Sequence, residues 1–488
     1  MKQICNPIFP LNEYIPDGEP HVFGDRVYLY GSHDKELGDR FCMLDYTVWS
    51  APVDDLSDWT NHGVSYKKSQ DKRATAEKLP DYYAPDCVRG NDGRYYLYYS
   101  AMGPNVRNFG PLSVAVSDSP AGPFEYLGDI RYPDGTPVLK FMNNDPAVLN
   151  DNGRIWLYYG WGLGRDFRNK IFKPIYDIVL SKIAQRSIKE VRETKPSILS
   201  CAVVELCDDM LTVKSEPKAV LDSKTTADKN SELYHHAFYE APSIRKIGDT
   251  YYLVYSSGEN NELAYATGKH PDRDFKFGGV IISNSDLGLD GNKVKKNNAG
   301  TIHGGIERIN GRWYVFYHRC TNNTDFSRQA CAEPIEILPD GSIKQVEITT
   351  GGLNPAPLGK GKFPAAICCH LYNPTIKAKK GNGNVEKYPC VTCKDGERII
   401  TSVTDGTVIG YKYFDLTGVS VVTLSVRGDE GRLCLGFNEE NMRDIALDIE
   451  KSSDWKKYRF EIKKSGKEPL YFTYEGKGRI EAKELIIE

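Results

Sequence analysis

Residues 92–100 read DGRYYLYYS, a turn signal followed at once by a strand rich in tyrosine. Aspartate and glycine are typical of tight turns, and runs of aromatic and β-branched residues favour a strand. The same pattern occurs five times along the chain. The copies are GDRVYLYGS (24–32), DGRYYLYYS (92–100), NGRIWLYYG (152–160), GDTYYLVYS (248–256) and NGRWYVFYH (310–318).

Each copy is followed by a further strand-like run and another turn. Five several-stranded units, about sixty residues apart, predict a five-bladed β-propeller, a ring of small antiparallel sheets around a channel. The interval between the third and fourth copies is longer and contains a partly helical stretch at 173–197. We interpret it as an insertion on one face of the ring. The alternative fold is an array of β-sandwiches with recurrent hairpins.

The chain has 488 residues, which favours two domains because a single core rarely grows that large. Residues 351–365, GGLNPAPLGKGKFPA, are rich in glycine and proline and are typical of a linker. Short alternating strands follow and predict a β-sandwich. The predicted division is a propeller at 1–352, a linker at 353–366 and a sandwich at 367–488, an all-β protein.

Composition excludes several classes of function. The formal net charge is −3, which gives no expectation of binding nucleic acid or an anionic membrane. No run of 18 apolar residues is present, and the first residues lack the apolar stretch of a secretory signal, so we expect a cytoplasmic protein. The 12 cysteines are scattered, and the Cys390–Cys393 pair has no second pair to complete a zinc site. The oligomeric state is left open.

A polar residue lies six to eight positions before the first residue of each repeat copy. These residues are Asp17, Asp86, Asp145, Glu240 and His303. The strand that leads each repeat is innermost in a propeller, so we expect these side chains to converge at one mouth of the channel. Carboxylates gathered there raise one another's pKa, which acid–base chemistry requires.

Each of these residues also has a structural interpretation when taken alone. Asp17 and Asp145 precede glycine and proline and are typical turn residues. His303 lies among glycines and is more often structural than a ligand. Glu240 is harder to explain this way, because an unpaired carboxylate is rarely buried at the head of an apolar strand. The shared position in the repeats favours the functional interpretation for the set.

At these residues the sequence resembles glycoside hydrolase family 43, the five-bladed propeller arabinofuranosidases and xylosidases. The resemblance covers about residues 5 to 350. The segments that carry it are PDGEPHVFGDRVYLYGSHD (16–34), YAPD (83–86), NNDPAVLNDNG (143–153), YEAPSIRKIGDTYYL (239–253), GTIHGGIERINGRWYVFYHR (300–319) and FSRQ (326–329).

The resemblance implies a role for each residue. Asp17 would be the general base, Asp145 the residue that orients the acid and tunes its pKa, and Glu240 the general acid. Arg328, with Tyr83 and Asp86 of the second blade, would contact substrate. His303 would help to hold a cation in the channel, commonly calcium.

Two departures from the family pattern stand out. Many members have Asp-Pro at the base, whereas this chain has Asp17-Gly18-Glu19-Pro20. Glu19 is therefore a second nearby carboxylate, although the spacing favours Asp17 as the base. The second-blade aromatic is Tyr83 where many members have tryptophan, which alters the surface on which a sugar would stack.

The resemblance implies an inverting hydrolase that releases arabinofuranose or xylose from plant-type oligosaccharides. The runner-up is a propeller phosphorylase, which would need Arg, Lys and His side chains around a phosphate. A third interpretation is a propeller that binds carbohydrate without catalysis. The C-terminal part resembles a family 6 carbohydrate-binding module, and bracing of the propeller is an equally good interpretation of its role. No organic cofactor is expected.

Overall fold

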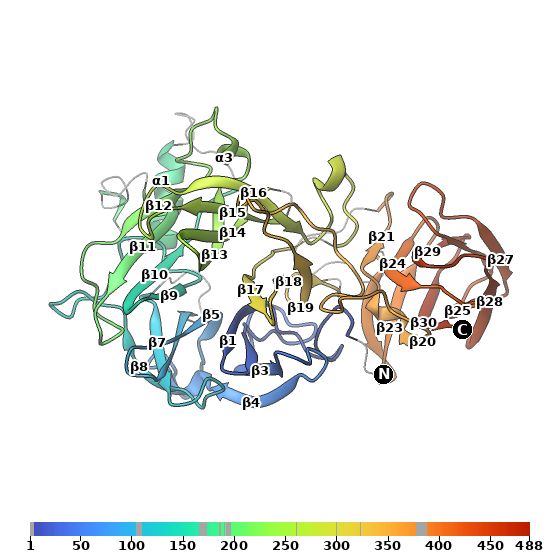
Figure 1. Cartoon of the computed structure of the whole chain (residues 1–488), viewed down its shortest axis with the longest axis horizontal. Helices are drawn as coiled ribbons and strands as arrows, with labels where there is room; N and C mark the ends of the chain where they lie inside the picture. Colours follow the sequence, from blue (N-terminus) through green and yellow to red (C-terminus); the bar gives the residue numbers. More distant parts are fainter. Residues whose placement is uncertain are drawn as a thin grey trace.

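The computed structural model describes residues 4–103, 110–164, 173–184, 187–189, 191, 197–259, 261–298, 300–322, 324–376 and 388–488. Figure 1 shows a ring of small sheets, coloured blue to yellow, beside a second domain of orange and red strands. Within the described residues, no helix is long and apolar enough to cross a membrane.

The ring consists of five antiparallel sheets, one for each repeat. The prediction of a five-bladed propeller is confirmed. The blades in order are β1 (Glu19–Phe23), β2 (Arg26–Tyr30), β3 (Tyr46–Pro52) and β4 (Thr60–Tyr66); β5 (Asp81–Arg89), β6 (Tyr95–Met102), β7 (Ser113–Ser117) and β8 (Glu125–Asp129); β9 (Ala147–Asp151), β10 (Arg154–Gly160), β11 (Ser200–Leu206) and β12 (Lys218–Asp222); β13 (Phe238–Ile247), β14 (Thr250–Ser257), β15 (Glu262–Gly268) and β16 (Lys276–Ser283); β17 (Ile306–Ile309), β18 (Arg312–Cys320) and β19 (Arg328–Ile335).

The repeat copies form the second strand of every blade. Within β2, β6, β10, β14 and β18, apolar and aromatic side chains are buried on both faces, because each sheet packs between two neighbours. The tight turn that opens each copy joins it to the innermost strand, β1, β5, β9, β13 or β17. Inner strands of neighbouring blades therefore lie side by side around the channel, as the contacts of β5 with β9 and of β1 with β17 show.

The N-terminal segment closes the ring on the last blade, which has three strands of its own. The N–H of Ile8 donates to the Ala330 carbonyl at 3.0 Å. The Asn6 amide bonds both backbone groups of Ala332, each at 3.0 Å, and donates to Glu333 at 2.8 Å. The first described residues thus lie along the edge of β19, which forms more than 300 residues later in the chain.

The insertion predicted between the third and fourth repeats contains helix α1 (Lys173–Ala184), and α3 (Glu232–His235) follows before the fourth blade. Part of residues 173–197 lies outside the described residues. The described residues also include four single turns of 3₁₀ helix: η1 (Lys68–Gln70), η2 (Ser197–Leu199), η3 (Leu289–Gly291) and η4 (Ala365–Ile367).

The C-terminal domain is a sandwich of two antiparallel sheets. One sheet has the order β22-β23-β30-β25-β28 with β20 paired to β30, and the other has the order β21-β24-β29-β26-β27. Their bounds are β20 (Gly361–Pro364), β21 (His370–Tyr372), β22 (Cys390–Lys394), β23 (Glu397–Val403), β24 (Val408–Asp415), β25 (Val421–Gly428), β26 (Gly431–Gly436), β27 (Ile445–Ile449), β28 (Ser452–Glu461), β29 (Lys467–Glu475) and β30 (Ile480–Ile487).

The stretch predicted as a linker, 353–366, is largely part of this domain. Leu358 and Phe363 are buried in the sandwich core, and β20 pairs with β30 along its whole length. Glycine and proline signalled a break in regular structure, but the apolar side chains between them decide where the segment packs.

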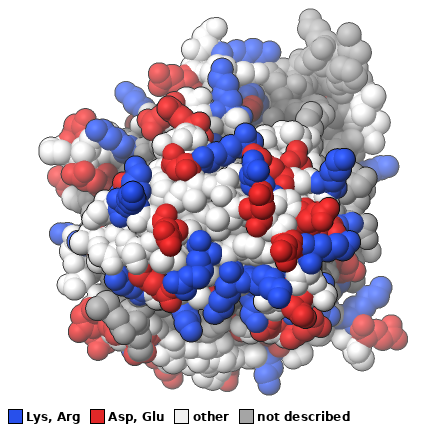
Figure 2. Space-filling model, turned by 90° about the vertical axis from the view of Figure 1, so that its right-hand side faces the viewer, with Lys and Arg blue, Asp and Glu red and all other residues white. Residues whose placement is uncertain are grey.

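Figure 2 shows the outer side of the C-terminal domain, where basic and acidic side chains are interspersed. Neighbouring strands pair them, as in Lys394 and Arg427 with Glu481, at 2.9 and 2.6 Å. Neither sign of charge dominates this side of the molecule.

Candidate active site

A left-handed turn marks the same place on four of the five blades. The residues are Asp17 (φ 58°), Ala84 (39°), Asp145 (46°) and Ala241 (62°), each followed by glycine or proline at the start of the inner strand. An L-residue adopts this conformation only at a cost in energy, so the surrounding contacts must hold it.

Each of these turns is held by a hydrogen bond from its own N–H. Ala84 donates to Ser32 at 2.8 Å, Asp145 to Ser100 at 3.1 Å, and Asp17 to Nδ1 of His318 at 3.2 Å. The three acceptors are the last residues of the repeat copies in the preceding blades. The repeats therefore end in serine or histidine because that side chain fixes the turn of the next blade.

The third copy ends in Gly160, which has no side chain to offer. The turn of the fourth blade instead donates from the Ala241 N–H to the Asp145 carboxylate at 3.1 Å. Asp145 thus bonds the peptide that directly follows Glu240. This explains how a residue of the third blade orients the side chain proposed as the acid on the fourth.

Asp17 is buried, with 4% of its surface exposed. Its Oδ1 accepts a hydrogen bond from Nη1 of Arg328 at 2.8 Å and lies 3.2 Å from His318 and 3.9 Å from His303. Burial raises the pKa of Asp17, but the opposing effects, led by the charge of the Arg328 guanidinium, more than offset it, so the pKa lies below its usual range. Asp17 is therefore ionised at neutral pH.

Arg328 is fixed by a second buried carboxylate, Asp34. The Arg328 side chain donates to it from Nε at 2.8 Å and from Nη2 at 3.0 Å, and its backbone N–H donates at 3.2 Å. The Phe41 ring lies 4.6 Å from the guanidinium carbon. One arginine thus joins two aspartates through charge-assisted bonds, and its position determines the charge seen by Asp17.

Glu240 and Asp145 have the opposite electrostatic environment. Burial, and then the negative charge of Asp17, raise the pKa of Glu240 to about 7, while Arg328 and a hydrogen bond from Trp161 act the other way. Burial and the charge of Glu240 raise the pKa of Asp145 as well. The two carboxyls interact strongly and hold a proton between them near neutral pH. The site therefore contains one ionised carboxyl, Asp17, and a pair of carboxyls, Asp145 and Glu240, that shares a proton.

The remaining predicted residues lie at two depths. Tyr83 precedes Ala84 just as Glu240 precedes Ala241, whereas the strand register aligns His303 with Asp17, and its Nδ1 lies 3.9 Å from that carboxylate. Burial lowers the pKa of His303 to about 4, which keeps it neutral. Asp86 follows its turn by two residues and lies deeper: it bonds His21 at 2.6 Å and the N–H of Val148 at 2.6 Å.

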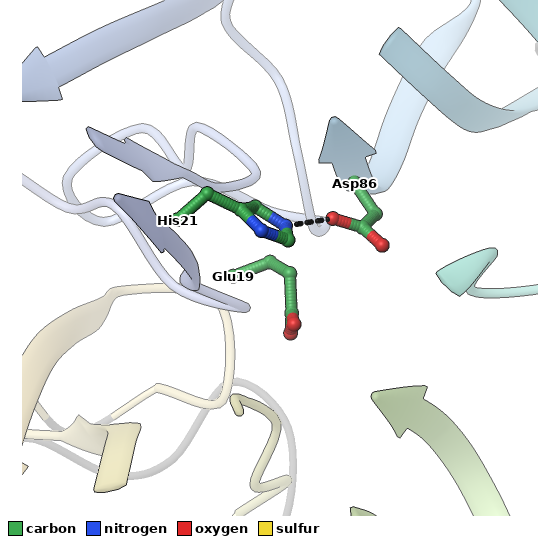
Figure 3. Close-up of side chains that lie close together, drawn as sticks. All are labelled: Glu19, His21 and Asp86. Atoms are coloured by element: carbon green, nitrogen blue, oxygen red, sulfur yellow. Dashed lines mark hydrogen bonds and ion pairs between the residues drawn. The ribbon is translucent and has the colours of Figure 1, made fainter. Parts of the chain in front are cut away.

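A second group of ionisable residues lies at that deeper level. Glu19, His21 and Asp86 come from the first two inner strands, and their ligand atoms all lie within 4.8 Å of one another (Figure 3). Gly305 lies against Glu19, because a Cβ there would be 2.7 Å from its Oε2. Among the described residues this is the one group of three that could hold a metal ion, and His303 is not part of it.

These residues fit a divalent cation in some respects. Oε2 of Glu19 is buried without a hydrogen-bond partner, which is expected of an oxygen that coordinates a cation. Oε1, however, already pairs with Arg245 at 2.8 Å and with Ser243 at 2.7 Å. Two carboxylates and one imidazole offer fewer oxygens than calcium prefers, so water would have to complete its shell.

Counting positions within the repeats predicts that Asp17, Asp145 and Glu240 lie close together, but it does not identify the residues that contact them. His318 and Asp34 are buried against Asp17 and Arg328. The sequence carried a signal for His318, which is the final residue of the fifth repeat where other copies have serine. Asp34 lies in an irregular loop, and no period of the repeats points to it.

Comparison with known families agrees with this geometry. A family model described as "Glycosyl hydrolases family 43" matches residues 4–343. The chain belongs to glycosyl hydrolase family 43. The match ends near the last propeller blade, so the family assignment rests on the domain that carries the carboxylates.

Curated relatives of this family-43 chain include xylosidase/arabinosidases from two organisms. The one from Thermoclostridium stercorarium is 41% identical over 510 aligned residues, covering 100% of this chain and 99% of that protein. Xylosidase/arabinosidase 43A from Humicola insolens is 32% identical, covering 68% of this chain and 96% of that protein. The full-length match shows that the C-terminal domain is shared as well.

A solved structure of similar fold is CoXyl43 from a compost microbial metagenome. It is a family-43 β-xylosidase/α-arabinofuranosidase in complex with xylotriose, described as a calcium-free form. The TM-score is 0.51 at 26% identity, over 69% of this chain and 96% of that one. With the family match, these findings establish the chain as a glycoside hydrolase that acts on carbohydrate.

Proposed function

We propose that this family-43 enzyme hydrolyses its substrate with inversion, Asp17 acting as general base and Glu240 as general acid. The observation that carries the proposal is the convergence of both carboxyls at one channel mouth, one kept ionised by Arg328 and the other with a pKa raised to about 7. An inverting enzyme needs that division of protonation states across one glycosidic bond.

The steps follow from the contacts. Asp17, an anion, removes a proton from a water molecule on one face of the sugar, and Glu240 donates its proton to the departing oxygen on the other. Asp145 bonds the peptide after Glu240, and because each of these two carboxyls raises the tendency of the other to hold a proton, one proton remains in the pair at neutral pH for Glu240 to donate. Asp17 and Asp145 are buried and Glu240 is half-buried, so little bulk water reaches them, which strengthens these effects.

Xylose and arabinofuranose are the proposed sugars. The support is the activity in the names of the two relatives and the xylotriose bound to CoXyl43. A phosphorylase is less well supported, because the Arg328 guanidinium beside Asp17 is already bonded to two aspartates. Proton NMR of the first-formed sugar from a xyloside and an arabinofuranoside tests both substrate and inversion, since retention of configuration contradicts the mechanism.

Isosteric variants separate the two catalytic roles. Asp17→Asn should lower kcat by about 10²–10⁴-fold on every substrate, because activation of water is always required. Glu240→Gln should cause a similar loss on an oligosaccharide but a much smaller one on a dinitrophenyl glycoside, whose leaving group needs little protonation. Equal losses of Glu240→Gln on both substrates would contradict its role as acid.

The matched control for these variants is Asp71→Asn. Asp71 is as buried as Asp17, with 3% exposed, but it bonds Tyr99 at 2.8 Å and Arg73 at 3.1 Å away from the channel mouth. This variant should lose stability yet keep kcat. A loss of kcat equal to that of Asp17→Asn would mean that burial, and not catalysis, explains the effect.

For the cation expected in the channel, we propose Glu19, His21 and Asp86 as ligands. A cation there would supply positive charge to two buried carboxylates. The support is their spacing within 4.8 Å and the unpartnered Oε2 of Glu19. Calcium and manganese titrated into chelator-treated enzyme, followed by calorimetry, should each reveal one site that Glu19→Gln weakens. Binding lost in His303→Ala and kept in Glu19→Gln would favour His303 as the ligand instead.

A further inference from the structure

The C-terminal domain reaches the propeller near the site through one arginine, Arg398 on β23. Its guanidinium bonds both carboxylate oxygens of Glu36, with Nη2 to Oε2 at 2.8 Å and Nη1 to Oε1. Nη1 also donates to the Tyr14 hydroxyl at 3.1 Å. The side chains of Arg398 and Glu36 are 13% and 28% exposed, so solvent screens this bidentate pair only in part.

Both partners of Arg398 lead directly to the proposed base. Tyr14 lies three residues before Asp17, and its carbonyl accepts the N–H of Asp34 at 2.9 Å. Glu36 lies two residues after Asp34. Asp34 in turn fixes Arg328, the residue that bonds Asp17. The contact with the C-terminal domain is therefore two residues in sequence from the clamp on the base.

The segment between β2 and β3, residues 31–45, has a second charged anchor in its later part, where Arg40 pairs with Asp81 at 2.7 Å and Lys68 donates to the carbonyls of Cys42 and Met43 at 2.9 and 3.0 Å. Leu37 donates its N–H to Ser327 at 2.9 Å, and Cys42 donates its N–H to Asp34 at 2.9 Å. The N–H groups of Leu37 and Cys42 are neutral donors, whereas the contact of Glu36 with Arg398 joins two full charges, as the Arg40–Asp81 pair does in the later part of the segment. The same segment carries Phe41 against the Arg328 guanidinium. Movement of this loop would displace both groups that orient Arg328.

We propose that Arg398 is a positioning residue for hydrolysis: the C-terminal domain uses it to fix residues 31–45, and so the Asp34–Arg328–Asp17 chain. The proposal rests on the role of Asp17 as base. It assigns the sandwich a part in catalysis that requires no sugar site of its own. A displacement of a catalytic group by about 1 Å can lower the rate about 10²-fold. An ion pair that anchors the loop can therefore affect the rate through the position of Asp17.

The test compares two breaks in the same domain interface. Arg398→Met removes the pair with Glu36. The control, Lys296→Met, removes the ion pair of Lys296 with Glu439, 2.7 Å long and 11% and 35% exposed, which touches neither the loop nor Arg328. Arg398→Lys keeps the charge but loses the bidentate geometry, and it serves where the methionine variant folds poorly. The measurements are kcat and KM on a nitrophenyl xyloside and the thermal midpoint.

Arg398→Met should lower kcat about 10-fold with little change in KM, Arg398→Lys should lie between it and the wild type, and Lys296→Met should keep kcat despite a similar fall in thermal midpoint. Exchanging the charges, Arg398→Glu with Glu36→Arg, should restore part of kcat. The proposal is overturned when Arg398→Met keeps wild-type kcat, or when Lys296→Met loses as much.

Failure of the underlying mechanism gives a different result. When Asp17→Asn keeps activity, the assignment of the base is wrong, whatever the Arg398 variants do. When Asp17→Asn is inactive and Arg398→Met is fully active, Asp17 remains the assigned base and only the positioning role of Arg398 is contradicted.

Discussion

His318 takes a position that serine holds in other blades, and it does two things there. Its Nε2 donates to the Thr301 carbonyl at 2.9 Å, so the neutral ring has an unprotonated Nδ1 that accepts the Asp17 N–H at 3.2 Å. Burial lowers the pKa of His318, which maintains this neutral form. The left-handed turn at Asp17 is thus held by the His318 ring, which Thr301 holds in turn.

The first prediction concerns this hydrogen bond. His318→Phe leaves the buried Asp17 N–H without an acceptor and should lower the free energy of unfolding by about 1–3 kcal/mol. His318→Asn keeps an oxygen or nitrogen near the position of Nδ1 and should cost less. Urea unfolding followed by tryptophan fluorescence measures both. Equal stability of the two variants would mean that ring volume, not the acceptor, matters at this position.

A second prediction at this scale concerns pH. The active form carries a proton on Glu240, so kcat/KM should fall as pH rises through its pKa of about 7. Asp145→Asn removes a neighbouring negative charge, which lowers the pKa of Glu240 and moves this fall to lower pH. It also weakens the bond to the Ala241 N–H, so we expect a loss of kcat of roughly 10- to 100-fold. An unchanged alkaline limb would show that Asp145 does not tune the acid.

The site residues differ in how far the sequence could reveal them. Asp17, Asp145 and Glu240 follow from counting within the repeats, because the fold repeats their backbone environment. The count places Asp86 with them, yet the structure puts it two residues further along its strand, against His21. The predicted residues lie six to eight positions before their repeat copies, a range of two positions. Along an inner strand, two positions correspond to a different depth in the channel.

At the scale of elements, the fifth blade is completed by the N-terminal segment, and Asn6 is its main polar link. Asn6→Ala leaves the Ala332 N–H without its acceptor and removes one of the donors to buried Glu333. We expect a loss of about 1–3 kcal/mol or more in the free energy of unfolding, because the ring opens where its ends meet. Asn230→Ala, at an exposed position before α3, is the control and should be nearly neutral. An unchanged free energy of unfolding in Asn6→Ala would show that the ring closes without these hydrogen bonds.

The predicted elements were most accurate where the aromatic repeat is strong, and least accurate between repeats. Tyrosine-rich strands with a turn before them identified all five second strands. The stretch 353–366 was misjudged because its glycines and prolines hid Leu358 and Phe363, which are buried in the sandwich. Composition marks where regular structure is interrupted, whereas burial of a few apolar side chains decides to which domain the segment belongs.

At the scale of the whole molecule, the two domains are joined by buried polar contacts. Arg319 of the propeller, 2% exposed, donates to the carbonyls of Cys368 and Cys369 at 3.1 and 2.8 Å. Asp286 of the propeller bonds His370 at 2.8 Å and lies 3.3 Å from Lys412, both of the sandwich. Such contacts are costly to break from one side, so the domains should unfold together.

Asp286→Asn removes the charge that Lys412 and His370 face, and breaking a buried ion pair from one side costs about 3–5 kcal/mol. Calorimetry should show one transition for the wild type and two for the variant, since the weakened interface lets the domains melt separately. Asp448→Asn, which breaks an exposed pair with Arg432 inside the sandwich, should leave one transition.

The wild type should show the same uncoupling at low pH. Burial raises the pKa of Asp286, but His370 and Lys412 outweigh it and hold the pKa below its usual range. The contribution of this carboxylate to stability is therefore present above about pH 4, the value for an unfolded aspartate, and is lost as pH falls through the lower folded pKa. A single transition in Asp286→Asn, with no separation in acid, would mean that the domains are held by their apolar contacts and by Arg319 instead.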